Sequence, residues 1–297
     1  MESGFAPRLR HPEAAADTLS TATDGPRVRI LLLGDVCAEP GRKAVEQSVS
    51  GLKQRLGVDF VIANAENAAA GYGITPRLAE GLLRAGVDCL TTGDHVYDRK
   101  EAWDYLGAER RILRPLNYPP DAPGRGFGMY ECAGVRVGVI SLLGRVFLKP
   151  LDCPFRRVLP VVNDMSKETP VIVVDFHAEA TAEKQALGWY LDGKVSAVLG
   201  THTHVQTGDE RVLPAGTGFI TDVGMCGSFD SVLGMSKELS LRRMIDMVPV
   251  RLHPATDDVR LNGVIVDVDI STGQTVGITR LAESVHLPPN QTAAPNV

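Results

Sequence analysis

The stretch VRILLLGD, residues 28–35, is a short run of apolar side chains that ends on Gly34 and Asp35. A run of this kind, without polar alternation, indicates a β-strand that is buried on both faces. Helical spacing of apolar residues follows over 41–56, and a second apolar run, VDFVIANAEN, occupies 58–67. This order of strand, helix and strand predicts a parallel sheet that is covered by helices.

The same alternation of strand and helix continues further along the chain. Thr75 and Pro76 stand where a helix is expected to begin, since threonine caps helices and proline fits their first turn. A further helix is predicted over residues 180–190. The other apolar runs that we interpret as strands are GVDCLTTGDH at 86–95, GVRVGVISLLG at 134–144, TPVIVVDFH at 169–177 and KVSAVLGTHTH at 194–204.

The C-terminal part of the chain has a different pattern. Apolar and polar residues alternate in VPVRL at 248–252, GVIVDVDI at 263–270 and TVGITRL at 275–281, and turn-forming residues lie between them. Such alternation predicts antiparallel strands. The sequence shows no internal repeat, so we predict one α/β domain with a mixed or two-sheet core.

The two ends of the chain differ from its centre. Residues 1–26 are polar, rich in alanine and threonine and without periodic apolar positions, and we interpret them as a disordered N-terminal extension. Residues 287–297 are similar in composition and are predicted to be a flexible tail. Residues 27–286 would form the single domain.

The composition argues against several classes of protein. The chain has 297 residues, of which 44% are hydrophobic and 23% charged, and its net charge of -5 does not favour a stable nucleic-acid partner. No apolar stretch approaches about 20 residues, so we expect no membrane association. The five cysteines form no CxxC pair and the N-terminus lacks the apolar core of a secretion signal, which predicts a cytoplasmic protein.

Side chains that can bind metals stand at the carboxyl ends of five predicted strands. Because the carboxyl ends of parallel strands meet at one edge of a sheet, we expect these side chains to converge. Four of the seven histidines lie in these short segments, whereas His11, His253 and His286 are interpreted as surface or structural residues. The strand-end set is Asp35, Glu66, Asn67, Asp94, His95, His177, His202 and His204.

This set of residue types is typical of a hydrolase with two metals. Two divalent ions about 3.5–4 Å apart can clamp a phosphoryl group and activate water, and one carboxylate has to bridge them. Imidazole and carboxylate ligands suit iron, manganese or zinc, and the thiolates of a structural zinc site are missing from the set. Taken singly, each aspartate could be a turn former or helix cap and each histidine a core residue, but together they predict a metal centre.

At this point the motifs allow a family to be named. GDV, NAENAA, TTGDH, DFHAEAT, GTHTHVQT and ITDVGM resemble the YmdB-like family of calcineurin-type metallophosphoesterases, over residues 28–281. The resemblance implies a four-layer α/β/β/α sandwich with mixed sheets. It also implies two divalent or trivalent metal ions, often iron or manganese, and phosphodiesterase activity on cyclic nucleotides, including 2′,3′-cyclic ones.

The resemblance also implies a role for each strand-end residue. One group would hold the first metal, with Glu66 bridging both metals, and a second group would complete the second. His95 would be the general acid that protonates the leaving oxygen, or a stabiliser of the transition state. The first group is Asp35, Glu66, Asn67 and His204, and the second is Asp94, His177 and His202.

Two positions depart from related motifs. Broader metallophosphoesterases begin with Asp-x-His, whereas this chain has Asp35-Val36-Cys37 and the family uses the Asn after the glutamate instead. The third family motif reads Gly-Asn-His, whereas this chain has Asp94 between Gly93 and His95. The aspartate adds one negative charge and removes an amide donor. We hypothesise that it favours a more highly charged metal pair or a changed pH optimum.

The predicted reaction is hydrolysis of 2′,3′-cyclic, and also 3′,5′-cyclic, nucleotides by a hydroxide that the two metals activate. A phosphomonoesterase or nucleotidase would use the same metals, and a signalling module would bind the nucleotide with little turnover. The Gly71-Tyr72-Gly73 loop could flank the opening, and a homo-oligomer is compatible with the sequence. Four residues are candidates for the lining of the pocket, although each could equally be a core or surface residue: Arg114, Asn117, Arg145 and Phe155.

Overall fold

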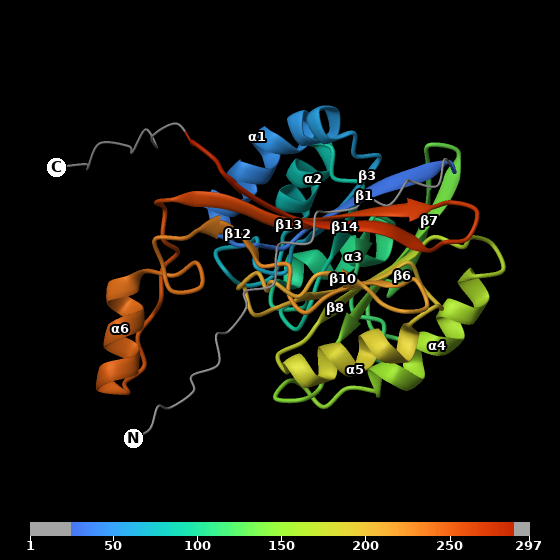
Figure 1. Ribbon diagram of the computed structural model, residues 1–297. Coiled ribbons are helices and arrows are strands. Elements are labelled where there is room, and N and C mark those ends of the chain that lie inside the picture. Colours follow the sequence, from blue (N-terminus) through green and yellow to red (C-terminus); the bar gives the residue numbers. More distant parts are fainter. Residues whose placement is uncertain (1–24, 288–297) are drawn as a thin grey trace, which may run out of the picture.

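The computed structural model describes residues 25–287, so the predictions for 1–24 and 288–297 fall outside the described residues. Two β-sheets pack face to face, and helices cover the outer face of each (Figure 1). Apolar clusters fill the space between the sheets and the space between each sheet and its helices. The α/β/β/α sandwich with mixed sheets that the family resemblance implies is thus confirmed.

The first sheet carries three of the predicted strand ends. Within residues 25–287 it has eight strands in the order β2-β12-β13-β1-β3-β4-β5, with β14 added on β13. β1, β3, β4 and β5 run parallel, and β13 pairs antiparallel with β1. The strands are β1 (Arg27–Leu33), β2 (Asp35–Val36), β3 (Phe60–Asn64), β4 (Cys89–Thr91), β5 (Ile112–Leu113), β12 (Met225–Ser228), β13 (Val259–Asp269) and β14 (Thr275–Ser284).

The second sheet carries the other two strand ends. In the described part of the chain it has six strands in the order β10-β11-β9-β8-β7-β6, and β7, β8, β9 and β11 run parallel. The strands are β6 (Phe127–Cys132), β7 (Val135–Leu143), β8 (Ile172–His177), β9 (Ala197–Thr201), β10 (Arg211–Val212) and β11 (Gly218–Ile220).

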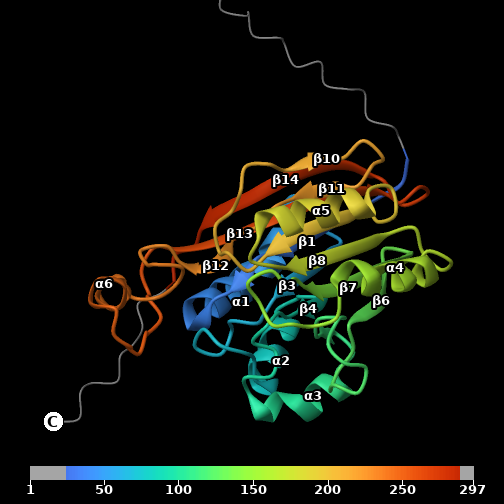
Figure 2. The same cartoon turned by 90° about the horizontal axis from the view of Figure 1, so that it is seen from below.

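Helices α1 and α2 lie on the first sheet, whereas α4 and α5 cover the second (Figures 1 and 2). Thr75 caps α2 as predicted, because its hydroxyl accepts a hydrogen bond from the Leu78 backbone N–H at 3.4 Å. α6 stands apart from the layers in both views. No helix among the described residues is both long and apolar enough to cross a membrane. The helices are α1 (Ala38–Leu56), α2 (Pro76–Arg84), α3 (Trp103–Ala108), α4 (Pro154–Met165), α5 (Thr181–Leu191) and α6 (Lys237–Asp246).

The position of strand β1 between two core clusters explains why its sequence is apolar without alternation. Ile30 and Leu32 point into the cluster between the two sheets, whereas Leu31 and Leu33 point into the cluster under α1. All four side chains are fully buried, and each contributes roughly 1.5–3 kcal/mol by leaving water. Both faces of the strand are therefore core, and the register that places Asp35 at the edge of the sheet is strongly specified.

The C-terminal prediction is right for two segments and wrong for the third. β13 and β14 form the expected antiparallel pair. The VPVRL segment at 248–252 is not a strand; it follows α6 as an irregular segment, and Val248 is 44% exposed. Pro249 has no N–H to donate to a ladder, which opposes strand formation there.

Candidate metal centre

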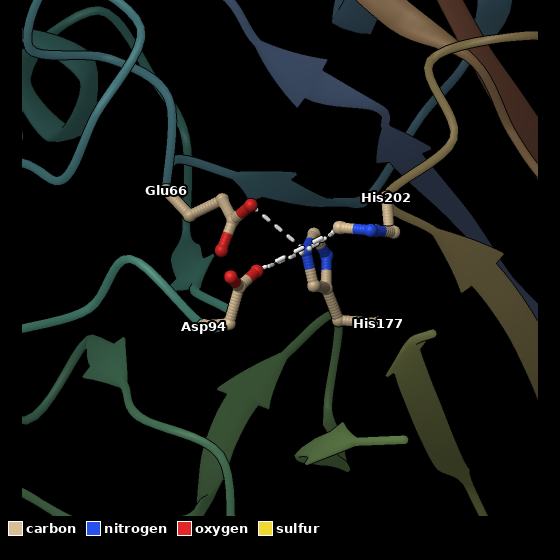
Figure 3. A group of neighbouring side chains, drawn as sticks. All are labelled: Glu66, Asp94, His177 and His202. Carbon is tan, nitrogen blue, oxygen red and sulfur yellow. Dashed lines mark hydrogen bonds and ion pairs between the residues drawn. The ribbon is translucent and has the colours of Figure 1, made fainter. Parts of the chain in front are cut away.

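The carboxyl ends of the parallel strands in both sheets meet at one edge of the sandwich. Glu66 and Asp94 follow β3 and β4 of the first sheet, His177 ends β8 of the second sheet, and His202 follows β9. One ligand atom from each of these four side chains lies within 4.8 Å of the others (Figure 3). The structure thus brings together the four residues that are assigned to the second metal or to the bridge.

The distances within this cluster are short. His177 Nε2 is 2.8 Å from Glu66 Oε1 and 2.9 Å from His202 Nδ1. Asp94 Oδ1 is 3.6 Å from His177 Nε2 and 3.7 Å from His202 Nδ1. His177 and Glu66 are almost fully buried, so these groups interact with little screening by water.

The residues assigned to the first metal lie beside this cluster. His204 Nε2 is 3.2 Å from Asn67 Oδ1 and 3.9 Å from Asp35 Oδ1. Asp35 is fully buried, and its Oδ2 accepts the backbone N–H of His202 at 3.0 Å. Asp35 therefore connects the two groups of residues.

Two of the histidines direct one ring nitrogen away from the cluster, towards an acceptor. His204 Nδ1 lies 3.1 Å from the Leu233 carbonyl and His202 Nε2 lies 3.1 Å from Glu179 Oε2. Because a carbonyl and a carboxylate only accept, these ring nitrogens carry the proton. The opposite nitrogens, His204 Nε2 and His202 Nδ1, then present lone pairs to the cluster. Such partners commonly orient metal-binding histidines.

A buried polar network orients His177 in the same way. Its Nδ1 is 2.9 Å from the Thr201 hydroxyl, which itself donates to Asp175 Oδ1 at 2.7 Å. Asn64 Nδ2 and the Thr91 hydroxyl donate to the other oxygen of Asp175. Since the single hydroxyl proton of Thr201 is used towards Asp175, its oxygen accepts from His177 Nδ1, and His177 Nε2 is left to face Glu66.

The cluster fits a cation. Asp35 Oδ1 and Asp94 Oδ1 are buried and have no hydrogen-bond partner among the described residues. A buried polar atom without a partner costs about 1–3 kcal/mol, so such atoms in a native fold call for a ligand. The lone pairs of His202 Nδ1 and His204 Nε2 face these oxygens, at 3.7 Å from Asp94 Oδ1 and 3.9 Å from Asp35 Oδ1 respectively. A bound metal ion would satisfy both kinds of atom.

The pKa shifts of His177 and Asp35 express the same demand for positive charge, whereas the pKa shift of His202 favours its neutral ring. Burial alone would lower the pKa of His177, but Glu66 and Asp94 raise it well above its ordinary value. Burial raises the pKa of Asp35 to about 6, although nearby histidines oppose the shift. Burial and the neighbouring His177 lower the pKa of His202 to about 4.

The loop after β9 is fixed by a buried ion pair. His202 and His204 have φ values of 101° and 64°, a region that residues other than glycine rarely adopt. Asp222 Oδ2 accepts the Thr203 backbone N–H at 3.0 Å and its hydroxyl at 2.8 Å. Lys184 Nζ pairs with the same oxygen at 2.7 Å, and both charged groups are buried. This pair fixes the loop conformation that directs both histidines to the cluster.

His95 lies at the margin of the cluster. Its Nδ1 is 2.8 Å from Asp98 Oδ2, and its Nε2 is 4.0 Å from Asp94 Oδ2. The Asp98 carboxylate accepts from Nδ1, so Nε2 faces the site. Lys149 Nζ also reaches this margin, where it donates to the Asp94 carbonyl.

Three of the candidate pocket residues have other roles. Arg114 is 5% exposed and Asn117 is fully buried, and their side-chain nitrogens donate to backbone carbonyls. Phe155 packs edge to face against Tyr190, with ring centroids 5.6 Å apart. Arg114 and Asn117 therefore have the core role that their sequence equally allowed, whereas a substrate contact of Phe155 stays a prediction. Only the residue type of these three residues had favoured a contact with the substrate.

Three partners of the histidines were missed by the sequence reasoning. Thr201 and Glu179 stand inside the GTHTHVQT and DFHAEAT blocks, so proximity to a strand-end histidine was an available signal. The third partner is the backbone carbonyl of Leu233, 29 residues beyond His204. A backbone atom carries no signature in the sequence.

Gly93 is required by the packing of the cluster. A Cβ at this position would overlap Glu66 Oε2 and the ring of His177. We therefore expect Gly93→Ala to displace both side chains and to reduce metal affinity by roughly 10- to 100-fold or more, the range seen for outer-shell changes. Isothermal titration with Mn²⁺ checks this, with Gly51→Ala, where nothing lies within 4 Å of the added Cβ, as control. Equal affinities in the two variants would contradict it.

Asp94→Asn tests the extra negative charge of this chain. Loss of one charged ligand should weaken metal binding on the order of tenfold, because affinity follows the charge of the ligand set. We also expect the pH–rate profile to move. Metal content after dialysis and the pH dependence of kcat/KM are the measurements. A variant with unchanged metal content and an unchanged profile would refute the hypothesis about Asp94.

Comparisons with known proteins identify the family of the chain. A family model described as YmdB-like protein matches residues 31–281. A 2′,3′-cyclic-nucleotide 2′-phosphodiesterase from Bacillus subtilis (strain 168) is 46% identical over 254 residues, which are 86% of this chain and 96% of that protein.

Two solved structures share the fold over nearly their whole length. A hypothetical protein from Thermus thermophilus has a TM-score of 0.81 and 40% identity, and the match covers 86% of this chain and 99% of that one. A novel phosphatase from Mycoplasma pneumoniae has a TM-score of 0.81 and 31% identity, with 88% and 94% covered.

Proposed function

The chain belongs to the YmdB-like family, and we propose that it is a metal-dependent phosphoric diester hydrolase that opens 2′,3′-cyclic nucleotides. The observation that carries the proposal is the cluster of Glu66, Asp94, His177 and His202, together with the unpartnered Asp94 Oδ1 within it and the unpartnered Asp35 Oδ1 beside it. The Bacillus subtilis relative, whose name states this substrate, adds the choice of a cyclic diester.

Two metal ions would be held by residues from both sheets. The first set is Asp35, Glu66, Asn67 and His204, and the second is Glu66, Asp94, His177 and His202. Bound metals would supply charge neutralisation for the phosphate and a lowered pKa for water. Iron or manganese suits this mixture of imidazole and carboxylate donors, and zinc also fits.

The chain's own residues would perform the remaining tasks. Glu179, Thr201 and the Leu233 carbonyl orient the histidine rings, so that His202 Nδ1, His177 Nε2 and His204 Nε2 face the cluster and would be the nitrogens that bind metal. His95, held by Asp98 through Nδ1, would in its doubly protonated form donate the Nε2 proton to the ribose oxygen that leaves phosphorus. The hydrogen-bond network around Asp175 lies at the base of the site and fixes the orientation of His177 through Thr201. We also propose that residues 27–286 act as one catalytic domain, since the shared core joins both sheets.

A substrate panel tests the proposed function. Metal-loaded protein should hydrolyse adenosine and guanosine 2′,3′-cyclic phosphates, and its kcat/KM for them should exceed that for 5′-monophosphates by more than about 100-fold, the discrimination expected when a site accommodates one ester geometry. Adenosine 3′,5′-cyclic phosphate is the second diester to compare. Higher efficiency on monophosphates would instead identify a phosphatase, the activity named for the Mycoplasma pneumoniae structure. Intact cyclic nucleotide after long incubation would identify a binding module.

A further inference from the structure

Tyr72 is an exposed aromatic side chain that borders the proposed general acid. It is 42% exposed, and its ring centroid lies 5.1 Å from that of His95 with the rings nearly perpendicular, at 87°. His95 Nε2 is only 4.0 Å from Asp94 Oδ2, so the His95 ring alone separates Tyr72 from the metal-binding cluster. Much of this large apolar surface remains in water beside the site.

The loop that carries Tyr72 is fixed before any ligand binds. Gly71 and Gly73, on either side of it, have φ values of 93° and 72°, which glycine tolerates and other residues rarely adopt. Arg99 donates to the Tyr72 carbonyl at 3.0 Å and to the Ala69 carbonyl at 2.8 Å. A surface loop with an exposed aromatic tip and so many constraints resembles a preorganised ligand contact.

The same loop is tied to a proposed metal ligand. Asn67 Nδ2 donates to the Gly71 carbonyl at 2.9 Å, and Asn67 Oδ1 faces His204 Nε2 at 3.2 Å. One side chain thus sets the distance between the first-metal residues and the Tyr72 loop. The position of Tyr72 is therefore defined relative to the first-metal residues as well as to His95.

We propose that Tyr72 is the platform on which the nucleobase of the cyclic nucleotide stacks. The inference rests on the proposed function. In a 2′,3′-cyclic nucleotide the base is attached to C1′, next to the carbon that bears the 2′ oxygen. A phosphate at the metal residues and a ribose oxygen at His95 would place the base on the His95 side, where Tyr72 lies. Stacking on an aromatic ring tolerates every base, so the platform predicts little base selectivity.

A different role for Tyr72 has a different kinetic signature. If the ring only positions His95 through their edge-to-face contact, its loss lowers kcat for every substrate. If the ring contacts the base, its loss raises KM for substrates that carry a base and spares those that do not. Stacking does not need the hydroxyl. If the ring contacts the base, phenylalanine should therefore replace tyrosine without loss.

The test compares adenosine 2′,3′-cyclic phosphate with methyl riboside 2′,3′-cyclic phosphate, which has the same reacting atoms and no base. Tyr72→Ala should raise KM for the adenosine substrate roughly tenfold, as expected from the loss of one base–aromatic stack, and should leave kcat/KM for the methyl riboside unchanged. Tyr72→Phe should behave as the wild type. Equal effects on both substrates, or no effect on either, would overturn the proposal.

Tyr190→Ala is the matched control. Tyr190 lies in the last turn of α5, is 37% exposed and also makes one edge-to-face contact. A second readout separates this proposal from the proposed function. Calorimetry with adenosine 3′-monophosphate should show roughly tenfold weaker binding to Tyr72→Ala than to wild type, whether or not cyclic diesters are turned over. Weakened binding without turnover would support the platform and refute the activity, and unchanged binding would refute the platform.

Discussion

Replacing Glu66 with alanine should remove both metal binding and activity. Glu66 is 1% exposed, lies 2.8 Å from His177 Nε2, and is the one carboxylate assigned to both metals. Without this carboxylate, the repulsion between two bound ions would no longer be offset. We expect kcat/KM for adenosine 2′,3′-cyclic phosphate to fall by at least about 10³-fold, equivalent to roughly 4 kcal/mol of transition-state stabilisation. Metal content by mass spectrometry and steady-state kinetics check both effects.

Glu66→Gln is the control for this prediction. Glutamine keeps the size of the side chain but removes its charge, so it separates lost packing from lost charge. We expect it to lose metal almost as completely as alanine does. Wild-type metal content together with wild-type kcat/KM in Glu66→Ala would contradict the assignment of Glu66 as bridge.

Replacing His95 with alanine should lower kcat by roughly 10²- to 10⁴-fold and leave the metal content unchanged, because the loss of a general acid affects proton transfer and not the metal ligands. His95 lies at the margin of the cluster and its nearest acidic contact is Asp98. Asp98→Asn should have a smaller effect, since it only reorients the ring. Steady-state kinetics on adenosine 2′,3′-cyclic phosphate, with metal analysis of the same preparation, are the measurements.

The leaving group distinguishes the two roles that His95 could have. A p-nitrophenolate ion leaves without protonation, so bis(p-nitrophenyl) phosphate should be hydrolysed by His95→Ala nearly as fast as by wild type. An equally large loss on both substrates would show that His95 stabilises the transition state instead. Unaltered turnover of the cyclic nucleotide would remove His95 from the mechanism.

Local sequence patterns predict the elements that surround the site. Strand β1 is apolar on both faces because both faces are core, and Thr75 and Pro76 mark the start of α2. Glu66 and His177 lie at the ends of strands of different sheets, and their 2.8 Å contact follows from the packing of the two sheets. Within each sheet, the rule that parallel strands end at one edge groups Glu66 with Asp94 and His177 with His202. This inference needs only the order of strands and helices, which short-range residue patterns encode.

Contacts between distant segments could not be predicted in the same way. The Lys184–Asp222 ion pair joins residues 38 positions apart, and neither residue stands at the end of a predicted strand. The Leu233 carbonyl that orients His204 belongs to the backbone, which is the same at every position. The approach of Tyr72 to His95 likewise depends on the path of two loops. Such contacts follow from the assembled fold.

The number of metal ions bound per chain tests the central claim most directly. Purified protein that is loaded with Mn²⁺, desalted and analysed by mass spectrometry should contain about two ions per chain. His204→Ala and His202→Ala should each lose about one ion, because their ring nitrogens face different groups of residues. A wild-type protein with no bound metal, or variants that both retain the wild-type metal content, would contradict a two-metal centre built from the strand ends of both sheets.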